Sequence, residues 1–360
     1  MNRFVILAAA LTVMFLSFSG CEKGSESIAP PQWVPPSVKP EPAVELQPVE
    51  TAQAQTKAEP NVQATTASEP NVQQPAAAKP LSAPAQPAEI NAAAQAPAAS
   101  VQTSADELCN KCTEFLSKFV DKDGFVDYKT LSRKKLELLT VLDRFRTLDR
   151  NVYNSWSQDN KIAFWINAYN LEFIKIILDN YPIESTRMLR LFWPPNSIRH
   201  IKGIWNEHKF IIMNEEFTLQ AIEQKFFKSE FGEPRVFFAI YYGTLSGPPL
   251  RNEAYCGKNL STQLDDQAKK FLARGEALKI ERENRMVYLS SILKPTWYGQ
   301  YFVARYGTDL KFKQQDPEVR AVLNYLAKYI PSSDVDYLET GNYTVDYMRY
   351  DWTLNERGGQ

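Results

Sequence analysis

The stretch PRVFFAIYYGTLSGPPLRNEAY, residues 234–255, carries the signals that decide the fold. After Pro234 and Arg235, residues 236–242 are continuously apolar or aromatic, and such a run is typical of a strand that is buried on both faces. Gly243, Gly247 and two prolines follow, and these residue types commonly end a strand in a tight turn. The sequence therefore predicts a buried strand over 235–242 that leads into a turn.

Helices and further strands are predicted on either side of this stretch. Helical periodicity appears over 106–119, 131–147, 158–180, 218–230, 259–273 and 316–330, and strand-like runs appear over 208–213, 278–281 and 285–290. The last two runs flank Glu283 and Asn284, which predicts a hairpin. Because helices cluster early and strands later, we expect an α+β fold, a single domain with a central buried helix and a small mixed or antiparallel sheet.

Four motifs occur in an order that points to a known family. They are AFWINAYN at 163–170, SIRHIKGIW at 197–205, the 234–255 stretch and YDWTLN at 350–355. In this order they resemble the domain of unknown function 547 family, and the resemblance runs from about Cys109 to Asn355. It implies one globular domain over 106–360. It carries over no activity, because the family has no established general one.

The reactive positions of the family pattern are replaced in this chain. The resemblance implies a histidine at position 237 and cysteines at positions 242 and 247, where the sequence has Phe237, Tyr242 and Gly247. A thiolate nucleophile needs a thiol and usually a base that activates it. We therefore expect a degenerate site without thiol chemistry at these positions.

Two asparagines lie on the helix predicted over 158–180, which is apolar almost all round and is therefore the expected central helix. Asn167 and Asn170 share one face of it. Either they brace the ends of the predicted strand, or they line a pocket at its C-terminal end, where a few polar groups would converge in an apolar wall. The ligand-binding candidates of the second alternative are Asn167, Asn170, Arg251, Glu253, Tyr255, Asp351 and Asn355.

The cysteines allow several roles. Cys109 and Cys112 form a CxxC on a predicted helix without a thioredoxin-like context, so we expect a local disulfide clamp or two buried thiols. Cys256 precedes a helix predicted to begin near Asn259, and a helix N-terminus can lower the pKa of a thiol. Cys256 is thus the one replacement nucleophile that the sequence offers.

Charge and histidine content exclude several functions. The formal net charge of −1 gives no general attraction to nucleic acid. The chain has two histidines, and the acidic stretch 121–128 lacks the spacing of a calcium loop, so we expect no metal site and read the stretch as a turn. No nucleotide-binding or zinc-protease motif is present, and we expect no cofactor.

A basic, aromatic segment follows the central helix. Its members are Arg187, Arg190, Phe192, Trp193, Arg199, His200, Lys202 and Trp205. It is interpreted either as a solvated loop whose aromatic residues cover the core, or as a binding site for an anionic ligand or a lipid headgroup.

The N-terminal residues predict export and a lipid anchor. Residues 1–21 have a basic start, a short apolar run and a small-residue context before Cys21, which is similar to a bacterial lipoprotein signal with Cys21 as the lipidated residue. Fourteen of the 23 prolines lie in 30–97, so residues 22–105 are predicted to be a disordered linker rich in Pro, Ala and Gln. Glu22 rather than Asp follows the cysteine, so an inner-membrane retention signal is missing, and the outer membrane is the favoured location.

Together these features favour a lipid-anchored protein of the cell envelope that has a binding or scaffold role. Its expected partners are the membrane, through the anchor, and an unknown small molecule or envelope protein. The alternative is an envelope hydrolase that uses Cys256, or carboxylates such as Glu253 and Asp351. A third possibility is a structural protein whose polar residues bind no ligand.

Overall fold

The computed structural model describes residues 96–358, and the side chains of 105–358 within that range. The predicted signal peptide over 1–21 and nearly all of the predicted linker lie outside the described residues. The first helix begins at Ala96, earlier than the predicted 106. None of the helices within 96–358 is both long enough and apolar enough to cross a bilayer.

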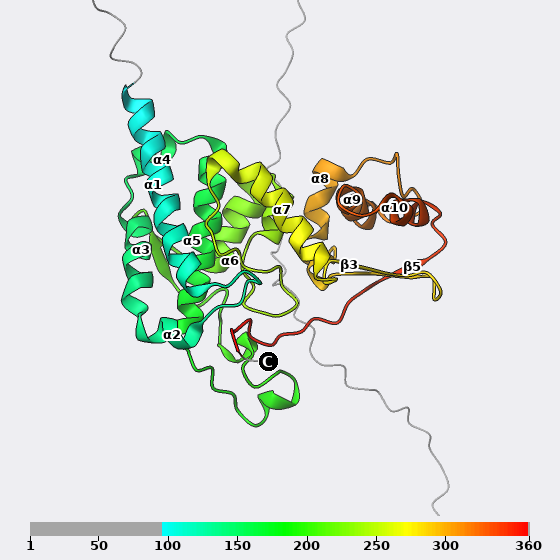
Figure 1. The fold of residues 1–360 in the computed structure, drawn as a ribbon, viewed down its shortest axis with the longest axis horizontal. Coiled ribbons are helices and arrows are strands. Elements are labelled where there is room, and N and C mark those ends of the chain that lie inside the picture. The colour runs from blue at the N-terminus through cyan, green and yellow to red at the C-terminus, as the bar shows by residue number, and fades with distance from the viewer. Residues whose placement is uncertain (1–95, 359–360) are drawn as a thin grey trace, which may run out of the picture. The chain divides into compact units, whose positions relative to one another are not determined.

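Ten α-helices and five strands make up the described part of the chain (Figure 1). The helices are α1 (Ala96–Phe119), α2 (Tyr128–Arg133), α3 (Lys135–Thr147), α4 (Arg150–Asn154), α5 (Gln158–Asp179), α6 (Leu219–Ile222), α7 (Leu260–Ala273), α8 (Val303–Tyr306), α9 (Pro317–Leu326) and α10 (Ser332–Glu339). The strands are β1 (Phe210–Ile212), β2 (Glu215–Phe217), β3 (Leu278–Glu281), β4 (Met286–Leu289) and β5 (Thr344–Tyr347). Short 3-10 or π-helical turns supplement them.

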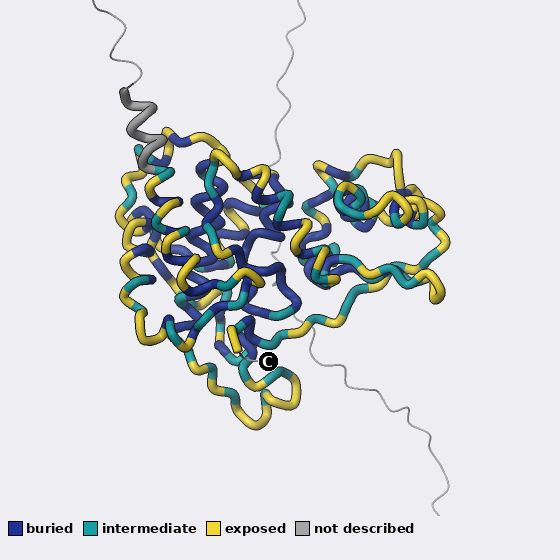
Figure 2. Tube along the Cα trace, in the orientation of Figure 1, coloured by how far each residue is buried: buried dark blue, intermediate teal, exposed yellow. Residues whose placement is uncertain are grey.

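The helix α5 is the centre of the fold, as the sequence predicts. It begins at the N-cap Ser157, whose hydroxyl accepts a hydrogen bond from the amide of Asn160, and Asp159 in its first turn complements the helix dipole. Trp165 and Ile166 are fully buried, and so are most residues around the helix from 160 to 178. Figure 2 shows the buried trace concentrated along α5 and the elements that surround it. The continuous apolar surface thus places α5 inside the core.

The predicted strand over 235–242 is wrong in its secondary structure but right in its burial. Residues Pro234–Phe238 form a 3-10 helix, with Pro234 at its start and the Glu233 carboxylate accepting a hydrogen bond from the Arg235 amide. The following backbone is held by Asn170, whose amide donates to the Ala239 carbonyl and accepts from the Tyr241 amide. A side chain therefore provides the hydrogen bonds that a neighbouring strand would provide in a sheet.

One sheet is antiparallel and the other is mixed, and both are small, which confirms the predicted fold class. β1 and β2 form an antiparallel hairpin. β3 and β4 form the hairpin that the sequence predicts, and β5 pairs with β4 in parallel. One continuous apolar core joins these elements to the helices, so the described residues form an α+β domain in which helices predominate.

The C-terminal segment returns to the centre of the domain after β5. The Leu245 amide donates to the Thr353 carbonyl at 3.0 Å, and the Asn355 amide donates to the Gly243 carbonyl at 3.2 Å. This pairing brings residues 350–356 against the turn that follows Tyr242.

The acidic stretch 121–128 forms a turn. The Asp121 carboxylate accepts hydrogen bonds from the Asp123 and Phe125 amides, and Gly124 adopts a φ of 86° that glycine accommodates readily. Among the described residues, no group of three or more His, Cys, Asp or Glu side chains is placed to hold a metal ion.

Candidate functional site

Aromatic rings fill the place where the family resemblance implies reactive groups. Phe237 is fully buried, and its ring stacks on that of Tyr298 with centroids 4.2 Å apart. The Tyr242 ring meets Tyr298 edge-on at 6.0 Å, and its hydroxyl donates to the Phe237 carbonyl at 3.0 Å. Close packing of this kind leaves little room beside Tyr298 for a substrate.

Positions 242 and 247 lie side by side. A Cβ atom placed on Gly247 would lie 3.0 Å from the Cβ of Tyr242. The three positions that the resemblance marks therefore meet in one region. In this chain it holds two rings and a glycine, and none of these groups is a nucleophile.

A buried network around Glu223 adjoins these rings through Tyr298. The Glu223 carboxylate accepts hydrogen bonds from the hydroxyls of Tyr169 at 2.8 Å and Tyr298 at 3.0 Å, and it pairs with the Lys228 ammonium at 3.1 Å. Burial, followed by the charge of Glu223, raises the pKa of both tyrosines well above the ordinary value. The phenols therefore stay protonated and act as donors. Sequence reasoning missed this network, because a glutamate in an amphipathic helix gives no sign of burial.

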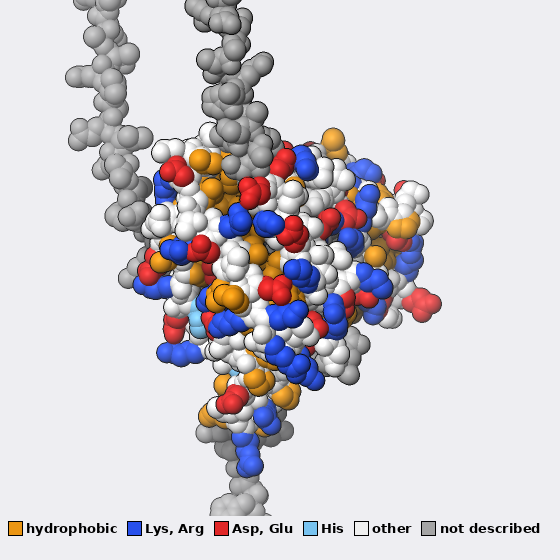
Figure 3. Space-filling model, turned by 60° about the vertical axis from the view of Figure 1, so that its left-hand side comes forward, with side chains coloured by type: hydrophobic (Ala, Val, Ile, Leu, Met, Phe, Trp, Pro, Cys, Tyr) orange, Lys and Arg blue, Asp and Glu red, His pale blue; other side chains and the backbone are white. Residues whose placement is uncertain are grey.

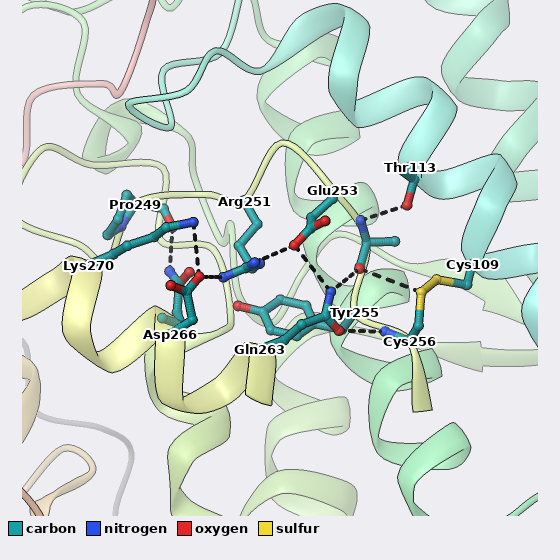
Figure 4. Close-up of polar contacts among 12 residues, drawn as sticks. Cys109, Thr113, Pro249, Arg251, Glu253, Tyr255, Cys256, Gln263, Asp266 and Lys270 are labelled. Carbon is teal, nitrogen blue, oxygen red and sulfur yellow. Dashed lines mark hydrogen bonds and ion pairs between the residues drawn. A yellow bond between two sulfur atoms is a disulfide. The ribbon is translucent and has the colours of Figure 1, made fainter. Parts of the chain in front are cut away.

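Arg251 is the centre of the second polar region (Figure 4). Its guanidinium pairs with the carboxylates of Glu253 and Asp266, and Lys270 also reaches Asp266, at 3.0 Å. Burial alone would raise the pKa of Glu253, but the hydrogen bonds and charge of Arg251 outweigh burial and hold that pKa below its usual range. Both carboxylates are therefore ionised partners of Arg251.

The turn next to Arg251 is tied to α5 and α7 through its backbone. The Asn167 amide donates to the Tyr255 carbonyl at 2.7 Å and accepts from the Tyr255 amide at 2.9 Å. Gln263 donates to the Ala254 carbonyl at 2.8 Å and accepts from the Cys256 amide at 2.9 Å. Asn167 thus braces this turn with both ends of its side chain, whereas Asn170 braces the backbone at 239–241, near the end of the predicted strand.

The cysteine predictions need correction. Cys109 forms a disulfide with Cys256, which joins α1 to the turn before α7, and Cys112 is a free, fully buried thiol. The predicted clamp between Cys109 and Cys112 is therefore wrong, and the alternative of two buried thiols holds for Cys112 alone. Cys256 has no thiol to act as a nucleophile. The physical reason is that Cys109 faces the turn before α7, where Cys256 lies, while Cys112 points into the core. Burial there raises the pKa of the Cys112 thiol.

The remaining candidates lie on the returning C-terminal segment. The Asn355 amide donates to the Gly124 carbonyl at 2.8 Å, so this side chain also braces backbone. Asp351 is exposed, and its carboxylate accepts a hydrogen bond from the Thr353 amide at 2.9 Å. The structure thus brings Arg251, Glu253, Tyr255 and Asn167 together, whereas within the described residues no side-chain hydrogen bond or ion pair links Asp351 or Asn355 to Arg251.

A third region gathers aromatic residues from distant parts of the chain around Arg199. The Arg199 guanidinium lies 4.6 Å from the ring centroid of Trp193, 5.1 Å from that of Trp352 and 5.8 Å from that of Trp205. Trp297 and Tyr350 extend the group by packing on Trp352. We call Trp193, Trp205, Trp297, Tyr350 and Trp352 the tryptophan cluster. The sequence indicated its first two members, but no local signal joins them to the other three.

A cavity of about 410 Å³ lies between α7, β3 and the segment that joins α9 to α10. None of the ligand-binding candidates lines it. Its lining residues are Lys269, Leu272, Ala273, Leu278, Ile280, Arg282, Tyr329, Ile330, Pro331 and Asp334.

Fold and site together define an α+β domain whose centre is filled by aromatic rings, and whose one free cysteine among the described residues is buried. Residues 153–272 match the model of the family described as "Protein of unknown function, DUF547", so the chain carries a DUF547 domain there. The match runs from α4 to α7 and includes α5, the replaced positions and Arg251. The wider resemblance, from Cys109 to Asn355, stays a prediction. No curated protein and no solved structure matches the chain.

Proposed function

We propose that this protein is a lipid-anchored component of the bacterial cell envelope, located in the outer membrane, whose domain acts by binding and not by thiol chemistry. The observation that carries the proposal is the packing of Phe237 and Tyr242 against Tyr298, which fills the region where relatives are expected to have reactive groups. The anchor rests on the sequence context of Cys21.

The state of the cysteines supports a binding role. Cys256 is bonded to Cys109, and Cys112 has no exposed surface. A disulfide of this kind also fits an oxidising compartment such as the cell envelope. A hydrolase that uses Cys256 would need a thiolate, so this half of the alternative loses its nucleophile.

The carboxylate version of the hydrolase finds no better support. Glu253 is held ionised by Arg251, and a general acid or base needs a pKa near the working pH. Asp351 is exposed and hydrogen-bonded to the backbone of its own turn. Neither carboxylate has the setting of a catalytic group.

A thiol count tests the proposal. The full-length chain with Cys21→Ser, purified without reductant, should show no reactive thiol in the native state. One thiol, that of Cys112, should appear on denaturation, and three should appear after reduction, since Cys109 and Cys256 are then released. In the matched Cys112→Ala variant the denatured chain should show none.

A native thiol that reacts stoichiometrically with an electrophile at neutral pH, much faster than a free thiol in solution, would restore Cys256 as a nucleophile. It would overturn the proposal that the domain acts without thiol chemistry.

A further inference from the structure

Exposed apolar side chains concentrate in one loop. Among the described residues, seven large apolar side chains are exposed, and three of them lie within five residues of each other. Met188 is 67% exposed, Leu191 78% and Phe192 47%. We call residues 187–193 the apolar loop. Single exposed apolar residues are normal on a protein surface, whereas a contiguous group indicates an interaction site.

Basic side chains accompany the apolar loop. Arg187 and Arg190 are both exposed. The Arg190 guanidinium donates to the hydroxyl of Ser185 at 2.7 Å, and within the described residues neither arginine pairs with a carboxylate. Two positive charges without an ion-pair partner thus accompany the exposed apolar side chains, one before Met188 and one between Met188 and Leu191. This combination favours docking onto a partner surface that carries negative charge on its outside and is apolar beneath that charge.

A backbone hydrogen bond, a 3-10 turn and two buried isoleucines hold the apolar loop in place. The Arg190 amide donates to the Thr186 carbonyl at 3.2 Å, and residues Leu189–Leu191 form a 3-10 turn. After the loop, Ile198 and Ile204 are buried in the core and fasten the segment to the domain. Figure 1 shows the chain between α5 and β1 projecting beyond the helices, and in Figure 3 the protrusion at the lower end carries apolar and basic side chains together with an acidic one.

The tryptophan cluster continues this surface from Trp193. All five of its residues are half-buried, so each of them packs on the protein and keeps some exposed surface. Indole and phenol rings with one apolar and one wet side are the side chains that concentrate at membrane interfaces. Arg199 in the middle of the rings has a buried Nε without a hydrogen-bond partner.

We propose that the apolar loop docks onto an anionic lipid bilayer. Met188, Leu191 and Phe192 enter the boundary between headgroups and acyl chains, while Arg187 and Arg190 lie at the lipid phosphates. The tryptophan cluster then lies at the headgroup level. The charge pattern selects the bilayer over a protein partner, because an exposed apolar tip with unpaired positive charges beside it matches the layered polarity of a membrane surface. The inference stands whether or not Cys21 is acylated.

A reporter on the loop tests this docking directly. In the full-length chain with Cys21→Ser, Leu191→Cys provides a single accessible thiol for a polarity-sensitive dye, because Cys112 is buried and the other two cysteines are bonded. The matched control is Leu310→Cys, since Leu310 is 79% exposed and lies far along the chain. Both labelled chains are titrated with vesicles of phosphatidylcholine alone, and with vesicles in which a quarter of the lipid is phosphatidylglycerol.

The expected result is a several-fold rise in dye emission at position 191 with the anionic vesicles, and no rise at position 310. In the labelled 191 chain, changing Arg187→Ala and Arg190→Ala together should shift the titration midpoint to a roughly 30-fold higher lipid concentration, since each basic residue near an anionic surface contributes about 1 kcal/mol. Circular dichroism checks that the variants stay folded.

Three results would overturn the proposal. One is unchanged dye emission at position 191 with anionic vesicles, which would indicate that the loop binds a protein partner instead. Another is an equal rise at positions 191 and 310, which means unspecific adsorption. The third is equal binding to neutral and anionic vesicles, or no effect of the two arginine changes, which removes the role of Arg187 and Arg190.

Discussion

Truncating Arg251 should destabilise the domain in a way that depends on pH. Its side chain is only 7% exposed, and its two partners, Glu253 and Asp266, are 44% and 43% exposed. The guanidinium also lies 5.8 Å from the centroid of the Tyr255 ring. Arg251→Ala therefore removes two ion pairs and part of the cover of a buried ring.

The magnitude follows from the exposure of the partners. Breaking a fully buried ion pair costs about 3 to 5 kcal/mol, because the remaining charge stays dry, while an exposed pair contributes less than about 1 kcal/mol. Here the arginine is buried but both carboxylates can hydrate once it is gone. We therefore expect a loss of about 2 kcal/mol in the free energy of unfolding at pH 7.

The pH dependence has a definite sign. The Arg251 interactions outweigh burial and hold the pKa of both Glu253 and Asp266 below the ordinary value. The stability from these pairs is present above the usual carboxyl pKa, and it is lost as the pH falls through the lowered one. The difference between wild type and Arg251→Ala should shrink below about pH 4.

Urea unfolding at pH 7 and pH 3 measures both effects. The matched control is Arg282→Ala, because Arg282 pairs with Asp334 at the surface with a side chain that is 48% exposed, and it should cost less than about 1 kcal/mol. A loss below about 0.5 kcal/mol for Arg251→Ala, or the same loss at both pH values, would refute the reasoning.

Three further predictions concern other parts of the chain. Removing the disulfide by Cys109→Ala with Cys256→Ala should lower the Tm by roughly 10 °C, because the bond closes a loop with a sequence separation of 147 residues, and a reductant should then have no further effect in a thermal melt. Burial raises the pKa of Glu172 from 4.5 to about 7, so the stability of the native protein should fall as the pH rises from 4.5 to 7. The Glu172→Gln variant should therefore be more stable than the wild type by up to about 3 kcal/mol at pH 8 and little changed at pH 4. An unchanged pH slope of urea unfolding would contradict this. Cys21→Ala should move the protein from membranes to the soluble fraction, and a membrane-bound variant with an unmodified N-terminal mass would exclude the lipid anchor.

The sequence predicted the parts of the fold that depend on local patterns. The sequence predicts the helix α5 because its apolar residues run around the whole helix, and it predicts the hairpin of β3 and β4 because two strand-like runs flank a short turn. The prediction of a strand over 235–242 is wrong, because a continuous apolar run indicates burial but does not indicate which group hydrogen-bonds the backbone. Here that group is the side chain of Asn170.

The polar regions were predicted less well, because their members come together across long separations. The CxxC spacing suggested a local bond, yet Cys109 meets Cys256 far along the chain. The sequence places Trp193 in an aromatic segment, but its contact with Trp352 depends on the return of the C-terminal segment. Such contacts leave no periodic signal in one sequence.

The Phe237 and Tyr242 rings pack on Tyr298 and fill the region where reactive groups are expected, and we propose that the domain binds elsewhere. The most direct measurement is an experimental structure of the full-length protein purified from its own membranes, with attention to the region beside Tyr298. We expect the Phe237 and Tyr242 rings to pack on Tyr298, as here, with no bound molecule between them. An open cavity at this place that holds a small molecule against Tyr298 and Glu223 would contradict it.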